Sequence, residues 1–167
     1  SARKYVMVDN RTNNAKAIIS SLRSTVGENI RVFRRIPVRI MGAFTEPVQP
    51  YMIEPKITEL LLENEKRKET MNPIERIARF HLEFEGIHPF IDGNGRTGRL
   101  ILNLDLIRNG YPPINIKFAD RKRYYDAFDE YYKNGNAAAM TDLVAGYVNE
   151  RLDDYLRVLG DGATNGK

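Results

Sequence analysis

The sequence predicts a mainly α-helical domain, a helical bundle that carries one β-hairpin. Five segments after residue 53 repeat apolar residues at the spacing of a helix face. One earlier segment alternates β-branched and aromatic residues with arginine, which is typical of a strand or hairpin. Of the 167 residues, 42% are hydrophobic and 29% are charged, and this balance suits one compact globular domain with its own core.

Composition and charge exclude several classes of site. The chain contains no cysteine, so disulfides and thiolate metal sites are excluded, and we expect a cytoplasmic protein. The net charge of +4 suits either an anionic ligand such as a nucleotide or an ordinary solvated surface. We expect no nucleic-acid partner, because no basic stripe is interleaved with aromatic residues. We expect no membrane span either, because no apolar run approaches ~18 residues.

The N-terminal third gives weak or extended patterns. Residues 1–29 form a weakly patterned N-terminal segment, in which residues 14–24 can form a short helix. RVFRRIPVRIMGAF, residues 31–44, carries the alternation expected of the hairpin. Residues 45–55 contain three prolines and are expected to form an extended connector.

Two predicted helices follow. Residues 54–69 have one apolar face, and the next helix has a clear start. Asn72 is a good N-cap, Pro73 suits the first helical position, and Glu75 stands where a capping-box acid belongs. One face of this second helix is predicted to be buried, at Ile74, Ile77, Ala78, His81 and Leu82.

Three further helices complete the bundle. Residues 96–110 are apolar nearly all round and close on a glycine, so this helix is predicted to lie at the centre. Residues 120–135 and 140–159 are amphipathic. The last residues, 160–167, are predicted to be a flexible tail.

The stretch HPFIDGNGRTGRL, residues 88–100, joins two of these helices and concentrates the chemistry of the chain. A Gly-Asn-Gly turn before a helix allows left-handed backbone angles, and its N–H groups can then converge on an anion. The helix start adds unpaired N–H groups and the positive end of the dipole. Arg96 and Arg99, spaced i and i+3, lie on one side of that helix and match phosphate oxygens. The stretch therefore predicts a polyphosphate site.

Two further side chains give this site a reaction. Asp92 can hold Mg²⁺ beside phosphate oxygens, since Mg²⁺ takes few protein ligands. His88 is the group that can accept a proton near neutral pH. Together they indicate transfer from a nucleoside triphosphate to a hydroxyl. A purely structural turn is the alternative. An EF-hand and a Walker A loop are excluded, because the positions after Asp92 lack their required residues.

These residues resemble the signature of the Fic family. HPFIDGNGRTGR, from His88 to Arg99, matches His-Pro-Phe-x-[Asp/Glu]-Gly-Asn-Gly-Arg-x-x-Arg at every fixed position. The helical segments on both sides are also similar to the family's core, and RRIPVRIMG is similar to the strand pair called the flap. The resemblance implies a Fic-type helical bundle with its flap beside the active site, and a catalytic domain over residues 30–159.

The resemblance implies a protein adenylyltransferase, which moves AMP from ATP-Mg²⁺ to a Ser, Thr or Tyr hydroxyl of a target protein and releases pyrophosphate. His88 would be the general base, Asp92 the Mg²⁺ ligand, and Gly93, Asn94 and Gly95 the anion hole. Arg96 would steady the phosphates, and Arg99 would reach the γ-phosphate. ATP and the target protein are the implied partners.

The resemblance also implies where the target and the adenine bind. The flap would present a strand edge to an extended target peptide, at Val38, Arg39, Ile40, Met41 and Gly42. The adenine would lie near Tyr124, Tyr125 and Tyr132, although tyrosines at helical spacing can equally be core residues. For His81, a buried structural histidine is favoured over a metal ligand.

Inhibition is the last implied property. Many Fic proteins carry an inhibitory glutamate in the pattern [Ser/Thr]-x-x-x-Glu-[Gly/Asn], and STVGEN places Glu28 there. Gly27 weakens a helix at that point, and Glu28 lies only 60 residues before His88, so we do not expect this role. Inhibition by a separate partner or a homo-oligomer is the alternative. Use of another donor, removal of AMP, and a non-catalytic nucleotide-binding module remain alternatives for the function.

Overall fold

The structure is a computed structural model that describes residues 33–40 and 46–164. Its regular elements are all helical and follow the chain in this order: η2 (Pro50–Met52), α2 (Ile53–Arg67), α3 (Pro73–Ile87), α4 (Asn94–Arg108), η3 (Phe118–Asp120), α5 (Arg121–Asn134) and α6 (Ala138–Thr164). The prediction of a mainly α-helical bundle is confirmed. The predicted helix at residues 14–24 lies outside the described residues.

The predicted hairpin is not found in the described residues. Residues 33–40 contain no strand, and residues 41–45, which would complete the hairpin, lie outside the described ranges. Residues 33–40 are held by the loop that follows α3, to which the Arg34 N–H donates a hydrogen bond at the Pro89 carbonyl, at 2.9 Å. Pro37 also has no N–H with which to extend a ladder.

The start of α3 confirms its prediction. The Asn72 side chain accepts a hydrogen bond from the Ile74 N–H at 2.9 Å, with Pro73 and Glu75 in the first turn. This arrangement satisfies one of the N–H groups that every helix start leaves unpaired. The face predicted to be buried is indeed enclosed at Ile77, Ala78, His81 and Leu82.

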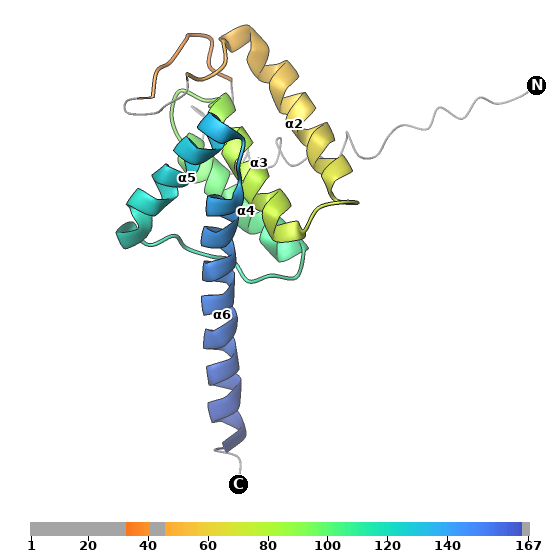
Figure 1. Ribbon diagram of the computed structural model, residues 1–167, viewed down its shortest axis with the longest axis vertical. Coiled ribbons are helices and arrows are strands. Elements are labelled where there is room, and N and C mark those ends of the chain that lie inside the picture. The colour runs from red at the N-terminus through yellow and green to blue at the C-terminus, as the bar shows by residue number, and fades with distance from the viewer. Residues whose placement is uncertain (1–32, 41–45, 165–167) are drawn as a thin grey trace, which may run out of the picture.

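Helix α3 is the centre of the bundle. It packs against α2, α4 and α6, while α5 packs against α6 (Figure 1). The prediction that residues 96–110 form the central helix is therefore wrong. Helix α4 buries Leu102 and Leu106, but 43% of Leu100 and 54% of Ile107 remain exposed. In the described part of the chain, the packing of α4 against α3 and α6 leaves part of its apolar surface uncovered.

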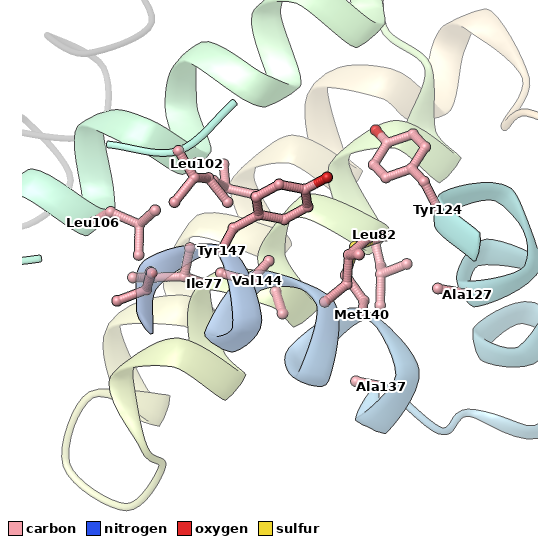
Figure 2. Close-up of a cluster of buried hydrophobic side chains, with 14 residues drawn as sticks. Ile77, Leu82, Leu102, Leu106, Tyr124, Ala127, Ala137, Met140, Val144 and Tyr147 are labelled. Carbon is pink, nitrogen blue, oxygen red and sulfur yellow. The ribbon is translucent and has the colours of Figure 1, made fainter. Parts of the chain in front are cut away.

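One hydrophobic core joins α3, α4 and α6. Figure 2 shows Ile77 and Leu82 of α3, Leu102 of α4 and Val144 of α6 gathered between the helices. A buried arginine, Arg76, adds a polar tie. It forms a bidentate ion pair with Asp105 of α4, at 2.7 and 3.2 Å, and donates to Asn64 of α2 at 3.0 Å. This network fixes α4, which begins at the candidate site, against α3.

Helix α6 extends beyond the bundle. Its C-terminal half projects away from the other helices in Figure 1, and Leu156, Val158 and Leu159 are about 70% exposed there. The helix continues to Thr164, into the residues predicted as a tail, because each added residue can extend the existing hydrogen-bond ladder. Within the described ranges, no helix is long and apolar enough to span a membrane.

Candidate active site

The loop between α3 and α4 carries the predicted chemistry. His88 caps the C-terminus of α3 with φ 51° and ψ 60°, and it is the only non-glycine residue with positive φ in the described part of the chain. A left-handed conformation costs a non-glycine residue about 1 kcal/mol. Surrounding contacts must therefore hold His88 in place, which makes its conformation a feature specified by the fold.

Asn94 closes the loop from within. Its Oδ1 accepts from the Phe90 N–H at 2.9 Å, and its Nδ2 donates to the Phe90 carbonyl at 2.8 Å. The side chain is buried, with 3% exposed. The family resemblance placed Asn94 in the anion hole, and this role stays a prediction. The side chain shapes the loop, so its backbone N–H is the group left for a ligand at the helix start.

The start of α4 has the form of an anion site. Gly93 is the N-cap, with φ 84°, and no side chain caps this end of the helix. The first turn contains no acidic residue. The first main-chain bond is the one from the Thr97 N–H to the Gly93 carbonyl, at 2.9 Å. The earlier N–H groups have no carbonyl partner within the helix, and the dipole makes this end positive.

Both predicted arginines lie at this helix start. Arg96 pairs with Asp92 at 3.0 Å, and both side chains are largely exposed. The guanidinium of Arg99 lies against Gly95, because a Cβ on that glycine would be 3.1 Å from Arg99 Nη1. The structure thus places the side chains of Arg96 and Arg99 beside the helix start and its unpaired N–H groups. Binding of phosphate oxygens by these side chains stays a prediction.

Asp92 is suited to bind Mg²⁺ when nucleotide phosphates provide further ligands to the metal. Its carboxylate is 84% exposed and lies beside the anion site. The described residues contain no cluster of three or more His, Cys, Asp or Glu that could enclose a metal. Mg²⁺ commonly uses one or two carboxylates together with waters and substrate phosphates. A single accessible carboxylate therefore fits this metal, with the phosphates supplying the remaining charged ligands.

His88 is neutral and able to accept a proton at neutral pH. Partial burial lowers the pKa of His88, the backbone of Glu85 raises it, and the nearby Arg34 lowers it. The net effect is a lowered pKa, so the neutral imidazole of His88 predominates at neutral pH. Nδ1 is buried without a hydrogen-bond partner of good geometry, although the Glu85 backbone lies near enough to affect the pKa. Nε2 is thus the nitrogen left to exchange a proton.

His81 is a structural residue behind the site. Its Nε2 lies 2.7 Å from the hydroxyl oxygen of Tyr124, and its ring packs between Tyr124 and Phe128. Burial lowers the pKa of His81 to about 4, against an opposing effect of the Gly98 backbone. The imidazole is therefore neutral. This environment agrees with the structural interpretation favoured by the sequence.

Glu85 is a feature that the sequence analysis missed. Its Oε1 is buried without a hydrogen-bond partner, and burial raises the pKa of Glu85 to about 7, although Arg99 opposes this. A Cβ on Gly98 would lie 2.1 Å from the same oxygen. The carboxyl group is thus packed between α3 and α4. The one signal in the sequence for this close approach of α3 and α4 is the glycine at position 98, which has no side chain to keep the helices apart.

The three tyrosines named for the adenine differ in their surroundings. Tyr124 is buried and uses its hydroxyl on His81, while the hydroxyl of Tyr132 donates to the Leu82 carbonyl. Tyr124 has the core environment that was the alternative, and Tyr132 is partly buried with its hydroxyl already bound. Tyr125 is 52% exposed, with Arg121 stacked over its ring at 5.5 Å. Adenine contact stays a prediction, for which Tyr125 is the accessible ring.

The predicted target-docking segment is described only in part. Val38 and Ile40 are partly buried, and Arg39 forms an exposed ion pair with Glu46 at 2.9 Å. Met41 and Gly42, like the candidate inhibitory Glu28, lie outside the described residues. Docking of a target at residues 38–42 remains a prediction.

Comparisons with known proteins agree with this geometry. Residues 12–106 match the family described as Fic/DOC. The protein adenylyltransferase Fic of Nematostella vectensis is 41% identical over 91 residues, which cover 54% of this chain and 21% of the relative. Fic-1 (residues 134–508) of C. elegans superposes with a TM-score of 0.74 at 27% identity, covering 89% of this chain and 44% of that one. The BepC protein of Bartonella tribocorum, solved with bound AMPPNP, superposes at 0.59 and 16% identity, covering 83% and 84%. The chain thus spans about a fifth of the curated relative.

Proposed function

The chain belongs to the Fic/DOC family, and we propose that it is a protein adenylyltransferase, which transfers AMP from ATP to a hydroxyl of a target protein. The observation that carries the proposal is one short loop. It places His88 at the end of α3 and, within a few residues, an uncapped helix start with Asp92, Arg96 and Arg99. The relatives named as protein adenylyltransferases and the AMPPNP bound to BepC support the same reading.

The residues of this chain divide the reaction among them. Nε2 of neutral His88 takes the proton of the attacking Ser, Thr or Tyr hydroxyl. The hydroxyl oxygen forms a bond to the α-phosphorus, and the bond from that phosphorus to the bridging oxygen of the β-phosphate breaks. Pyrophosphate leaves with the negative charge. AMP is then joined to the target through a phosphodiester, and the proton remains on His88.

The start of α4 stabilises the charge of this transfer. The N–H groups near Gly93 and Gly95 are fixed before substrate arrives, so they cost no reorganisation when charge develops on the phosphate oxygens. Arg96 and Arg99 offer two further donors on the same side. Mg²⁺, held by Asp92, would neutralise charge on the phosphates. Asp92 also pairs with Arg96 at 3.0 Å, so the carboxylate that would hold the metal lies next to a guanidinium that can bind the phosphates.

Label transfer from ATP tests the proposal. The protein is incubated with Mg²⁺ and ATP labelled on either the α- or the γ-phosphate, with the protein itself as acceptor. We expect label from the α-phosphate only, and a loss of about 10²- to 10⁴-fold in His88→Ala. Glu69→Gln, at an exposed residue outside the loop, is the control and should keep the wild-type transfer. Label from the γ-phosphate would indicate a kinase, and no label from either position would favour a nucleotide-binding module.

A further inference from the structure

Arg34 is a buried cation whose guanidinium is bound entirely to backbone carbonyls. Only 2% of the residue is exposed. Nε donates to the His88 carbonyl at 2.8 Å, Nη1 to the Ile36 carbonyl at 3.0 Å, and Nη2 to the carbonyls of Val48 and, at 3.4 Å, Ile87. Burying a charge is costly unless hydrogen bonds replace its water. This many bonds from one side chain indicate a specific task.

The bonds converge on the end of α3. The guanidinium binds the carbonyls of Ile87 and His88, and the Arg34 N–H binds the carbonyl of Pro89 at 2.9 Å. Three consecutive carbonyls therefore have the same residue as partner. The last carbonyls of a helix lack partners within it, and a cation there also complements the negative end of the dipole. Arg34 thus caps α3 where the chain turns into the active-site loop.

The conformation of His88 depends on this cap. His88 is left-handed although it is not glycine, and such a residue relaxes unless its neighbours over-determine it. The peptide groups on both sides of His88 have their carbonyls bound by Arg34. We propose that Arg34 is a positioning residue, which locks His88 in the left-handed conformation and so sets the direction of its imidazole relative to the start of α4. This inference rests on the proposed role of His88.

The same side chain connects the base to the chain segment expected to hold the target. Its bonds to Ile36 and Val48 bracket residues 38–42, while its bonds to Ile87 and His88 hold the loop. A target that breaks the bond of Arg34 to Ile36 or to Val48 would therefore also shift His88, because the same guanidinium binds the His88 carbonyl. Lysine cannot replace this geometry, because an ammonium is a point donor and lacks the planar fork that reaches several carbonyls.

The proposal is tested with Arg34→Lys and Arg34→Gln in the full chain. Arg35→Gln is the matched control, since it removes the same charge from an exposed neighbour. Rates of α-phosphate transfer give kcat and the KM for ATP. The imidazole of His88 is followed in parallel by NMR titration, which is practicable because the chain has two histidines and the pKa of His81 lies near 4. Thermal unfolding gives the folded fraction of each variant.

A positioning role predicts a specific combination of results. Arg34→Lys should lower kcat about 10- to 100-fold while changing the KM for ATP less than about twofold. Arg34→Gln should in addition raise the pKa of His88, because Arg34 lowers it, and so move the acidic limb of the rate profile to higher pH. Arg35→Gln should change neither property.

Two results would overturn the proposal. One is an Arg34→Lys variant that keeps the wild-type kcat, and the other is a fall in kcat that only mirrors a loss of folded protein. If the wild-type chain transfers no label at all, the proposed function fails, but the NMR comparison still decides the positioning role. His88 signals that respond equally to changes at Arg34 and Arg35 would then exclude it.

Discussion

The side chain of Asn94 forms two hydrogen bonds with the main chain of one residue, Phe90, at 2.9 and 2.8 Å. The same arrangement recurs further along α4, where Asn103 accepts from the Ile114 N–H at 2.7 Å and donates to its carbonyl at 2.9 Å. One asparagine shapes the loop of the candidate active site, and the other anchors the connection that follows α4. Replacing each asparagine in turn therefore distinguishes a loss of stability, which both variants should show, from a loss of function, which only the Asn94 variant should show.

Asn94→Ala and Asn103→Ala should both destabilise the protein by about 2 kcal/mol. Each removes two hydrogen bonds and leaves backbone groups without partners. Only Asn94→Ala should also abolish nucleotide binding, because only that loop sets the N–H groups at the start of α4. Urea denaturation and calorimetric titration with ATP measure the two effects. Equal losses of ATP affinity in both variants would contradict the assignment of Asn94 to loop closure.

Gly98 and Gly146 are both helical glycines, yet their replacement by alanine should have opposite effects. At Gly98 the new Cβ would lie 2.1 Å from Glu85 Oε1 and 3.1 Å from His81 Cε1. We expect Gly98→Ala to destabilise by about 1–3 kcal/mol, since the buried Glu85 and His81 side chains would have to move away from the new methyl group. A Cβ on Gly146 would have no described atom within 4 Å beyond its neighbours in the same helix, so Gly146→Ala should stabilise by up to about 1 kcal/mol. Thermal unfolding of both variants gives the two signs.

Glu85 and His81 should give the stability opposite dependences on pH. The pKa of Glu85 is raised to about 7 by burial, so the folded state binds this proton more tightly than the unfolded state. Its contribution is present at low pH and is lost as pH rises towards 7. The pKa of His81 is lowered to about 4, so its contribution is lost as pH falls below its ordinary value. The two trends oppose each other between roughly pH 4.5 and 6.5.

Glu85→Gln should therefore stabilise the protein at pH 8 and change little at pH 5. At pH 8 the wild type carries a buried carboxylate whose ionisation costs about 3 kcal/mol, and the amide removes that cost. The variant should also lose stability on acidification more steeply than the wild type, since His81 then acts alone. Urea denaturation between pH 5 and pH 8 measures both effects. Glu69→Gln, at an exposed glutamate, is the control, and the same gain in stability at pH 5 and pH 8 would contradict the prediction.

The features predicted correctly from the sequence have causes that lie within a few residues. The start of α3 depends on Asn72 and Pro73, which act on the next turn. The position of Arg96 and Arg99 in the first turns of α4, just after the Gly-Asn-Gly turn begins, follows from helical spacing alone. Local interactions of this kind survive any packing of the remaining chain, so a pattern can identify them.

The errors arose where distant segments decide the outcome. The apolar residues of α4 predicted a central helix, but α3 occupies that place and leaves Ile107 exposed. Residues 33–40 have a strand-like pattern, yet these residues form no strand and Arg34 binds the end of α3. In both cases the outcome depends on how separate elements pack, which a local sequence pattern does not record.

The sequence alone was enough to place a histidine, a carboxylate, two arginines and a glycine turn within twelve residues, because all of them fall between His88 and Arg99. The folded structure sets which other side chains contact this stretch. Arg34 reaches His88 across 54 positions, and Glu85 becomes buried only when α4 packs against α3 at Gly98. Hydrogen bonds and burial depend on which groups are close in space, and for these residues that closeness exists only once the helices have assembled.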